Sequence, residues 1–294
     1  MLIDFSTTTN ASNKANNGIQ ALSEFTKSVG FVGAGRMATA LARGCVESGL
    51  VSAEQVLASD PSLEARQAFA EQVAGVEVFD TSEPILSRAD IIVLAIKPQV
   101  MSSVLENLGS QIAEHQLVVS IAAGVTLSTI TEALPAKARI IRVMPNTPCL
   151  VGEGVSCFSR AKEATDEDAE DVRRVLESVG HAYEVTEEQL DAVTGLSGSG
   201  PAFIYQVIES MAKGGAQMGL PAELALKLAA QTARGAAQMV LATGRSPIEL
   251  REQVTSPGGT TVAGLDALAK LRGAEAFCEA VVVATRRSQE LGRG

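Results

Sequence analysis

The sequence predicts an α/β fold, with a Rossmann-type doubly wound parallel sheet domain followed by an all-α helical domain. Short apolar runs alternate with helical patterns between residue 29 and about residue 150, which is typical of parallel strands joined by crossover helices. A glycine-rich turn follows the first run, and after residue 160 Ala-rich segments with helical spacing replace the strands. We therefore expect a sheet domain at residues 29–188, a helical domain at residues 189–294, and a flexible tail rich in Thr, Asn and Ser at residues 1–28.

The expected strands are nearly all apolar and do not alternate, as strands do when helices cover both faces of a parallel sheet. Most of them are followed by Gly, Pro or Ser, where the chain can turn. The five runs are Val29–Val32, Gln55–Ser59, Ile91–Ile96, Leu117–Ile121 and Ile140–Met144.

The second half contains five helical segments with clear start and stop signals. Pro201 is tolerated in a first turn, and Gly219 and Gly244 stand where helices end. Small residues crowd two of these helices, which therefore either pair tightly, also between subunits, or simply carry good helix formers at surface positions. The expected helices are Glu167–Val179, Pro201–Met218, Ala222–Thr243, Thr261–Leu271 and Glu275–Leu291.

Composition and charge exclude several classes of protein. The 34 acidic residues outnumber the 24 Lys and Arg residues, the formal charge is -10, and no basic patch is present, so we expect no nucleic-acid partner. The longest uncharged stretches, such as residues 192–208, contain Thr, Ser, Gly and Gln, so we expect no membrane span. The four cysteines have the spacing of neither a metal site nor a disulfide framework, which indicates a cytoplasmic protein without a bound metal.

A G-x-G-x-x-A motif follows the first expected strand and opens an Ala-rich helix. Gly33 permits the tight turn, Gly35 lets the backbone approach a pyrophosphate, and Ala38 is small enough for the helix to pack on the sheet. Unpaired N–H groups at the helix start would meet the phosphate charge. Glycine pairs also mark plain turns, but the strand before the motif and the helix after it favour a dinucleotide.

Asp60 stands at the end of the second expected strand, where an acidic residue can bind the adenosine ribose. A carboxylate at this position repels a 2′-phosphate. The same residue could instead only cap the turn before Pro61, so this motif leaves the choice between NADH and NADPH open.

Three further segments end strands on the edge of the sheet where open α/β folds bind ligands. Lys97 would contact a cofactor or a carboxylate there, or would be only a solvated loop charge. The small residues 122–124 close the next strand, and Asn146 could hydrogen-bond nicotinamide or ribose.

Residues 255–261 read T-S-P-G-G-T-T and precede a helical pattern, so hydroxyls, glycine N–H groups and a helix start coincide. Such a segment can hold a carboxylate without an arginine, or it is only a helix cap after a glycine turn. The loop before Pro201 does not match G-x-S-x-G, and neither His115 nor His181 has a nucleophile near it in sequence, so no triad is expected. The cofactor must carry the chemistry.

Six motifs together resemble pyrroline-5-carboxylate reductase, between about residues 29 and 291. They are G-F-V-G-A-G from Gly30, A-I-K-P from Ala95, A-A-G-V from Ala122, M-P-N-T-P from Met144, L-S-G-S-G-P-A from Leu196 and S-P-G-G-T-T from Ser256. The resemblance implies hydride transfer from NADPH or NADH to the imine carbon of pyrroline-5-carboxylate, which gives L-proline in the last step of proline biosynthesis. It also implies that the helical domain is a dimerisation domain, in a homodimer or a ring of five dimers.

The resemblance also implies the site residues. The cofactor would be lined by Val32, Gly33, Ala34, Gly35, Arg36, Met37, Asp60, Ala95, Ile96, Lys97, Pro98, Ala122, Ala123, Gly124 and Asn146. The substrate would be held by Glu187, Gln253, Ser256, Gly258, Gly259, Thr260 and Thr261. Thr261 is the expected catalytic residue, because one hydroxyl can share a proton with the imine nitrogen. Similar enzymes commonly have serine in place of Asp60, so we expect this chain to use NADH comparably well or better.

Two other functions would fit parts of the sequence. A β-hydroxyacid dehydrogenase would need a lysine early in a long interdomain helix, whereas Lys213 lies beyond the opening turns of its helix. A non-enzymatic dinucleotide sensor would not need the second anion site at Ser256–Thr261.

Overall fold

The computed structural model describes residues 25–292 and divides into two compact units. The larger unit contains residues 25–201 and 278–292, and the smaller unit contains residues 202–277. Residues 1–24 of the predicted tail lie outside the described residues. Two of the last four residues of that predicted tail contact the larger unit: Phe25 is 7% exposed and Ser28 N–H donates to Asp90 Oδ2 at 2.8 Å.

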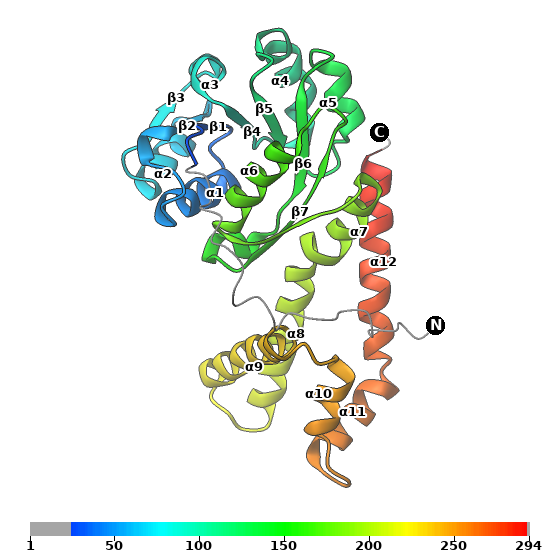
Figure 1. The fold of residues 1–294 in the computed structure, drawn as a ribbon. Coiled ribbons are helices and arrows are strands. Elements are labelled where there is room, and N and C mark those ends of the chain that lie inside the picture. Colours follow the sequence, from blue (N-terminus) through cyan, green and yellow to red (C-terminus); the bar gives the residue numbers. More distant parts are fainter. Residues whose placement is uncertain (1–24, 293–294) are drawn as a thin grey trace, which may run out of the picture. The chain divides into compact units, whose positions relative to one another are not determined.

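The larger unit contains an eight-stranded sheet in the order β3-β2-β1-β4-β5-β6-β7-β8 (Figure 1). Strands β1 to β6 pair in parallel, which confirms the doubly wound sheet, and the reversal of strand order lies between β1 and β4. The strands are β1 Val29–Val32, β2 Val56–Ser59, β3 Glu77–Phe79, β4 Ile91–Leu94, β5 Leu117–Ser120, β6 Arg139–Met144, β7 Gly154–Arg160 and β8 Gly180–Glu184.

The sequence predicts a parallel sheet, but the observed sheet is not wholly parallel. β7 runs antiparallel to β6, because only the short helix η4 at Thr147–Val151 and a turn at Gly152 connect them, too few residues for a crossover. Strand β7 was not among the expected strands. Strands β3 and β8 were also not expected. They carry polar residues such as Glu77 and His181 at the two edges of the sheet, where a strand needs no apolar run.

Helices cover both faces of the sheet and form two core clusters. On one face α1 Arg36–Glu47, α2 Leu63–Gln72 and α6 Asp166–Glu177 bury Phe31, Phe69 and Phe158. On the other face α3 Glu83–Arg88, α4 Met101–Leu108 and α5 Leu127–Ala133 bury Leu94 and Ile130. Each of these fully buried side chains stabilises the fold by roughly 1.5–3 kcal/mol.

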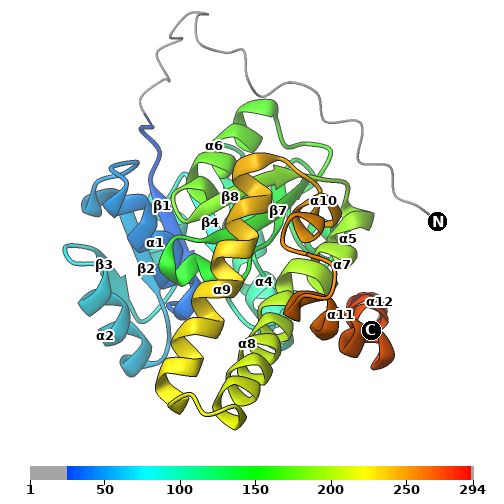
Figure 2. The same ribbon diagram turned by 90° about the horizontal axis from the view of Figure 1, so that it is seen from below.

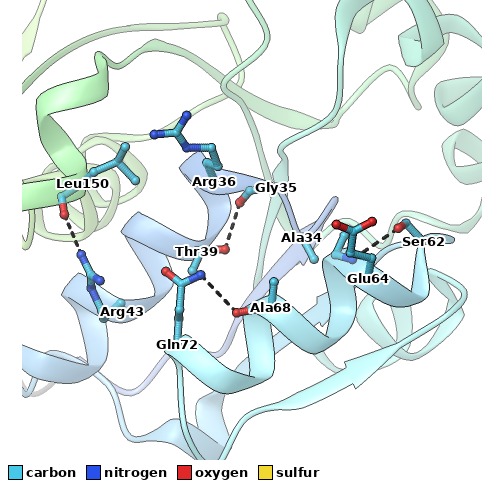
Figure 3. A pocket seen from close by; sticks show the side chains of 11 residues that line it. Ala34, Gly35, Arg36, Thr39, Arg43, Ser62, Glu64, Ala68, Gln72 and Leu150 are labelled. Atoms are coloured by element: carbon cyan, nitrogen blue, oxygen red, sulfur yellow. Dashed lines mark hydrogen bonds between the residues drawn. The ribbon is translucent and has the colours of Figure 1, made fainter.

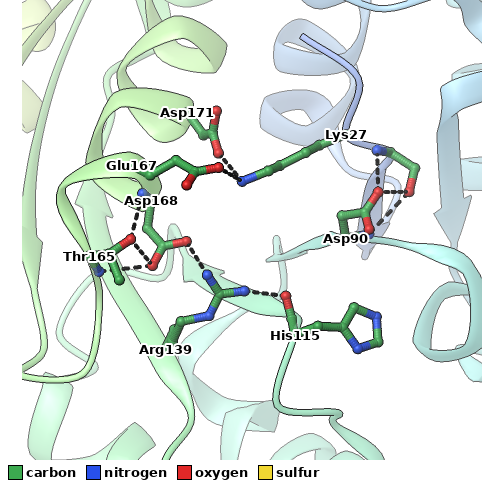
Figure 4. A network of polar contacts seen from close by, with 9 residues as sticks. Lys27, Asp90, His115, Arg139, Thr165, Glu167, Asp168 and Asp171 are labelled. Atoms are coloured by element: carbon green, nitrogen blue, oxygen red, sulfur yellow. Dashed lines mark hydrogen bonds and ion pairs between the residues drawn. The ribbon is translucent and has the colours of Figure 1, made fainter.

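A polar network lies where the parallel strands begin (Figure 4). Asp168, whose side chain is 1% exposed, accepts hydrogen bonds from Arg139 Nη1 at 2.6 Å and from Thr165 N–H at 2.8 Å. Lys27 pairs with Glu167 at 3.0 Å and so fastens the segment before β1 to α6. These contacts stabilise the edge of the sheet where the parallel strands begin.

The remaining helices include those of the smaller unit. They are α7 Leu190–Val193, the π-helical turn Thr194–Gly198, α8 Gly200–Gln217, α9 Ala222–Thr243, α10 Pro247–Gln253, α11 Thr260–Lys270 and α12 Gly273–Leu291. Figure 2 shows α8 and α9 side by side, joined by the short turn at residues 218–221. Helix α10 was not expected from the sequence, although Pro247 and a capping box of Ser246 and Glu249 mark its start. No helix in the described part of the chain is long and apolar enough to cross a membrane.

The smaller unit buries few of its side chains. Within residues 202–277 only Ala225 and Ala229 are buried, whereas Met218 is 87% exposed and Leu241 is 74% exposed. Exposed apolar surface of this extent is typical of a protein–protein interface.

Within the larger unit, residues 278–292 of α12 pack against α7 and the π-helical turn. Ser288 Oγ donates to Asp191 Oδ1 at 2.6 Å, and a Cβ added to Gly195 would lie 2.2 Å from Thr285 Oγ1. The glycine therefore permits the close contact between α12 and the π-helical turn. The expected boundary between residues 188 and 189 stays a prediction.

Candidate functional site

The glycine-rich turn connects β1 to α1 at the carboxyl edge of the sheet. Gly33 has a φ of +103°, and a Cβ there would lie 2.5 Å from the carbonyl oxygen of Ala95 on the neighbouring strand. Only glycine fits this position. Gly35 is the N-cap of α1 and has open space around its Cα, so a ligand can approach the backbone and the unpaired N–H groups of the first helical turn.

Asp60 connects the end of β2 to this turn. Its Oδ2 accepts a hydrogen bond from Ala34 N–H at 3.0 Å, and its Oδ1 accepts one from Ser62 N–H at 2.9 Å. The second contact is the turn cap considered from the sequence. The first is a contact between the acidic residue and the glycine-rich turn, which local sequence did not show.

A cavity of about 540 Å³ opens between α1 and α2 beside the glycine-rich turn (Figure 3). Its size is within the range of small-molecule sites. Hydrogen bonds between lining residues shape it, among them those from Thr39 Oγ1 to the Gly35 carbonyl and from Arg43 Nη2 to the Leu150 carbonyl. The lining residues are Ala34, Gly35, Arg36, Thr39, Arg43, Ser62, Glu64, Ala65, Ala68, Gln72 and Leu150.

The structure places most of the expected cofactor residues at one edge of the sheet. Strands β2, β1, β4 and β5 pair in register, so the segments that follow them, at residues 60, 33–37, 95–98 and 122–124, lie next to one another. Lys97 is exposed there as the N-cap of the short helix η2 at Pro98–Val100. Gly124 has a φ of +76°, in a turn that faces Leu291.

Asn146 follows β6, but its amide already has two protein partners. Its Oδ1 accepts from Val155 N–H at 3.0 Å, and its Nδ2 donates to the Ser197 carbonyl at 3.2 Å. The side chain is 7% exposed and holds the π-helical turn against the end of β6. Such turns are frequent at functional sites. A contact between Asn146 and the cofactor stays a prediction.

Glu187 belongs to a half-buried ion pair that the sequence did not reveal. Its Oε1 accepts from Leu127 N–H at 2.6 Å, at the start of α5, and lies 3.1 Å from Arg142 Nη1. Arg142 is 5% exposed. An arginine inside an otherwise apolar expected strand was the available signal, because a buried charge requires a partner.

The expected substrate residues from Gln253 to Thr261 lie in the smaller unit. Gly258 has a φ of +70°, and Gly259 is the N-cap of the eleven-residue helix α11. One of the two glycine N–H groups expected to bind an anion is already used: Gly259 N–H donates to the Ser256 carbonyl at 2.9 Å. The N–H groups available to an anion are therefore those of the first helical turn, beside the partly exposed Thr261.

The cysteines take no part in this arrangement. Burial raises the pKa of Cys45 to about 11 and also raises the pKa of Cys149 and Cys157, so these thiols stay protonated near neutral pH. Among residues 25–292 no group of three His, Cys, Asp or Glu side chains could hold a metal ion.

Comparisons with known proteins match both halves of the chain. The family model for pyrroline-5-carboxylate reductase dimerisation matches residues 187–291, and the model for NADP oxidoreductase, coenzyme F420-dependent, matches residues 28–124. The pyrroline-5-carboxylate reductase of Methanosarcina acetivorans is 47% identical over 268 residues, which cover 90% of this chain and 98% of that protein. The enzyme of the same name from Arabidopsis thaliana is 45% identical and covers 90% of this chain and 95% of its own length.

Two solved structures are similar along nearly the whole chain. A pyrroline-5-carboxylate reductase from Coxiella burnetii has a TM-score of 0.84 and 33% identity, covering 90% of this chain and 98% of its own. The Plasmodium falciparum pyrroline carboxylate reductase, solved with NADP bound, has a TM-score of 0.82 and 32% identity. The match covers 91% of this chain and 99% of that protein's chain.

Proposed function

The chain belongs to the pyrroline-5-carboxylate reductase family, and we propose how its residues perform the reaction of that family. It is an NAD(P)H-dependent oxidoreductase that reduces the imine carbon of pyrroline-5-carboxylate to give L-proline, the last step of proline biosynthesis. The observation that carries this function is that the glycine-rich turn and the Ser256–Thr261 turn both lie inside the matched residues. Neither a β-hydroxyacid dehydrogenase nor a sensor accounts for both matches.

We place the cofactor at the carboxyl edge of the sheet. When bound, NAD(P)H supplies the hydride. Ala34 N–H is already bonded to Asp60, so the pyrophosphate is held by the N–H groups of Gly35, Arg36 and Met37 at the start of α1. The open space at Gly35 supports this fit. The segments Ala95–Pro98 and Ala122–Gly124, with Val32, Gly33, Asp60 and Asn146, complete the proposed lining.

The proposed substrate residues are Gln253, Ser256, Gly258, Gly259, Thr260 and Thr261, with Glu187. The N–H groups at the start of α11 bind the substrate carboxylate, and the Thr261 hydroxyl donates a hydrogen bond to the imine nitrogen. This arrangement fixes the imine carbon and lets it accept hydride, so most of the rate gain comes from positioning. Glu187 is engaged with Arg142 and α5, which supports a positioning role for it.

The chain forms homo-oligomers through its dimerisation region at residues 187–291. We propose a homodimer, or a ring of five such dimers, as the assembly. The exposed apolar side chains of α8 and α9, including Tyr205 and Leu226, support a partner copy on this surface. We also propose residues 29–188 as the dinucleotide-binding domain and residues 189–294 as the substrate-binding domain. The buried free thiols support a cytoplasmic location, which fractionation of the source cells would test.

The function is tested by following NADH and NADPH oxidation at 340 nm with pyrroline-5-carboxylate, and by identifying proline as the product. A 3-hydroxy acid (β-hydroxy acid) with the oxidised cofactor serves as the rival substrate. Turnover of the imine supports the proposal, and turnover of the hydroxy acid alone would contradict it.

A further inference from the structure

We propose that Asp60 makes this enzyme select NADH over NADPH, and that its carboxylate excludes a 2′-phosphate because two backbone N–H groups hold it in place. This inference rests on the proposed cofactor site and concerns its specificity. Asp60 then has two roles: it stabilises the glycine-rich turn and it determines which cofactor binds.

The carboxylate, the N–H group and the carbonyl of Asp60 are all hydrogen-bonded in the described structure. Its Oδ2 lies 3.0 Å from Ala34 N and its Oδ1 lies 2.9 Å from Ser62 N, so each oxygen accepts one N–H. Its own N–H donates to the Phe79 carbonyl at 3.0 Å, and its carbonyl accepts from Arg66 Nη1 at 2.7 Å. Rotating the carboxylate away would leave two N–H groups without their acceptor, so the charge cannot easily move to make room for a phosphate.

The remaining lone pairs of the same carboxylate suit a ribose hydroxyl. Each carboxylate oxygen can accept two hydrogen bonds, and each uses only one on the backbone. An acidic residue at the end of this strand of a Rossmann sheet accepts from the 2′-hydroxyl of the adenosine ribose. NADH offers that hydroxyl, whereas NADPH offers a phosphate that would bring negative charge against Asp60.

The charges around the cavity add to this preference. Glu64 lines the cavity on the same side as Ser62, which supplies a second carboxylate. Arg66, the nearest cation along the chain, donates to the carbonyls of Asp60 and Pro61 and is therefore engaged with the turn. Arg36 is drawn with its guanidinium turned away from Ser62 and Glu64 (Figure 3). A 2′-phosphate beside Asp60 would therefore meet these two carboxylates, while the lining guanidinium of Arg36 points away from Glu64.

The experiment compares the cofactors in the wild-type enzyme and in Asp60→Ser, Asp60→Asn and Glu71→Gln. Glu71 is an exposed carboxylate of α2 outside the cavity lining, so its variant removes one charge without touching the site. For each protein we would measure kcat/KM with NADH and NADPH at fixed pyrroline-5-carboxylate, and Kd for each cofactor by fluorescence without substrate. We expect the wild type to favour NADH by about tenfold or more.

We expect both Asp60 variants to shift the NADH-to-NADPH ratio toward NADPH by about tenfold or more, while Glu71→Gln leaves the ratio unchanged. Asn has one acceptor oxygen, so Asp60→Asn should also weaken NADH binding severalfold through the loosened turn. A purely structural role would weaken both cofactors equally and leave the ratio unchanged, which would overturn the inference. A wild type that prefers NADPH would also overturn it. Because Kd is measured without substrate, an enzyme that binds NADH selectively but does not reduce the imine would contradict the proposed function and leave the selectivity intact.

Discussion

The two units of this chain differ in how they are stabilised. In the larger unit the strands β1, β2, β4 and β5 are buried along their whole length. In the smaller unit the long helix α9 buries only Ala225 and Ala229, and Leu224, Leu226 and Leu228 are each about half exposed. The larger unit therefore contains its own core, whereas the smaller unit leaves apolar surface for another copy of the chain to cover.

The proposed cofactor site and the proposed substrate site differ in the same way, because the first lies in the well-packed larger unit and most of the second in the smaller unit. The cofactor segments are held by contacts within the larger unit, such as that of Gly33 with Ala95. The substrate turn before Thr261 lies in the smaller unit and has mainly local contacts. Cofactor binding should therefore depend on the sheet unit alone, and turnover should depend on both units.

The largest expected effect is on stability, from removing a core side chain of the larger unit. Phe31→Ala should lower the free energy of unfolding by about 3–5 kcal/mol, because Phe31 is fully buried in β1. Leu241→Ala, at a side chain 74% exposed in the smaller unit, should change it by less than about 0.5 kcal/mol in the monomer. Urea denaturation followed by circular dichroism measures both. A cost at Leu241 that increases with protein concentration would place this side chain in the subunit interface.

The next effect is on catalysis. Thr261→Ala should lower kcat by about a hundredfold, because the imine nitrogen loses its hydrogen-bond donor, and should leave the Kd for NADH nearly unchanged. Thr243→Ala, at the last residue of α9 in the smaller unit, is the matched control. Steady-state kinetics and fluorescence titration provide the two readouts. An unchanged rate at saturating substrate would remove Thr261 from the mechanism.

An alkaline destabilisation should arise in the larger unit. The pKa of Cys45 is raised from 9.0 to about 11 by burial, so above pH 9 the unfolded chain loses this proton while the folded chain retains it. Stability is then lost progressively as the pH rises from 9 to 11, by about 2–3 kcal/mol from this thiol. Cys45→Ala should reduce the slope, and the exposed Cys278→Ala should not. Urea midpoints between pH 8 and 11 would show whether the two variants behave alike, contrary to this expectation.

The smallest effect compares one kind of helix cap in the two units. Ser62 accepts from Ala65 N–H at the start of α2, and Ser246 accepts from Glu249 N–H at the start of α10. Each Ser→Ala change should cost about 1 kcal/mol locally. Helix α2 is fastened to the core by Phe69, so its loss should appear in global unfolding, whereas α10 buries no residue and should only fray. Hydrogen exchange distinguishes the two, and equal global losses would contradict the comparison.

The sequence predicted what depends on local pattern. Strand β1 and helix α9 begin and end at the expected residues, and the glycine-rich turn lies between a strand and a helix as expected. It did not predict β7, in which serines interrupt the apolar residues. It also did not predict β3 or β8, because short edge strands with polar residues have no apolar run.

The parts of the site that were missed depend on contacts between residues far apart in the chain. Arg142 and Glu187 are 45 residues apart, and Asn146 and Ser197 are 51 residues apart. Nothing in a local window shows that such residues meet. The unexpected contact of Asp60 with Ala34 is of the same kind, since 26 residues separate them.

The contact between residues 278–292 and residues 191–195, two segments of the larger unit, has a consequence for how the protein folds during synthesis. Because Ser288 and Thr285 pack against residues 191 and 195, the smaller unit is inserted between two pieces of the larger one. The ribosome must therefore make all of residues 202–277 before the sheet unit can complete its packing. Domains often fold in order as they emerge, but here the first one to emerge is the last to be finished.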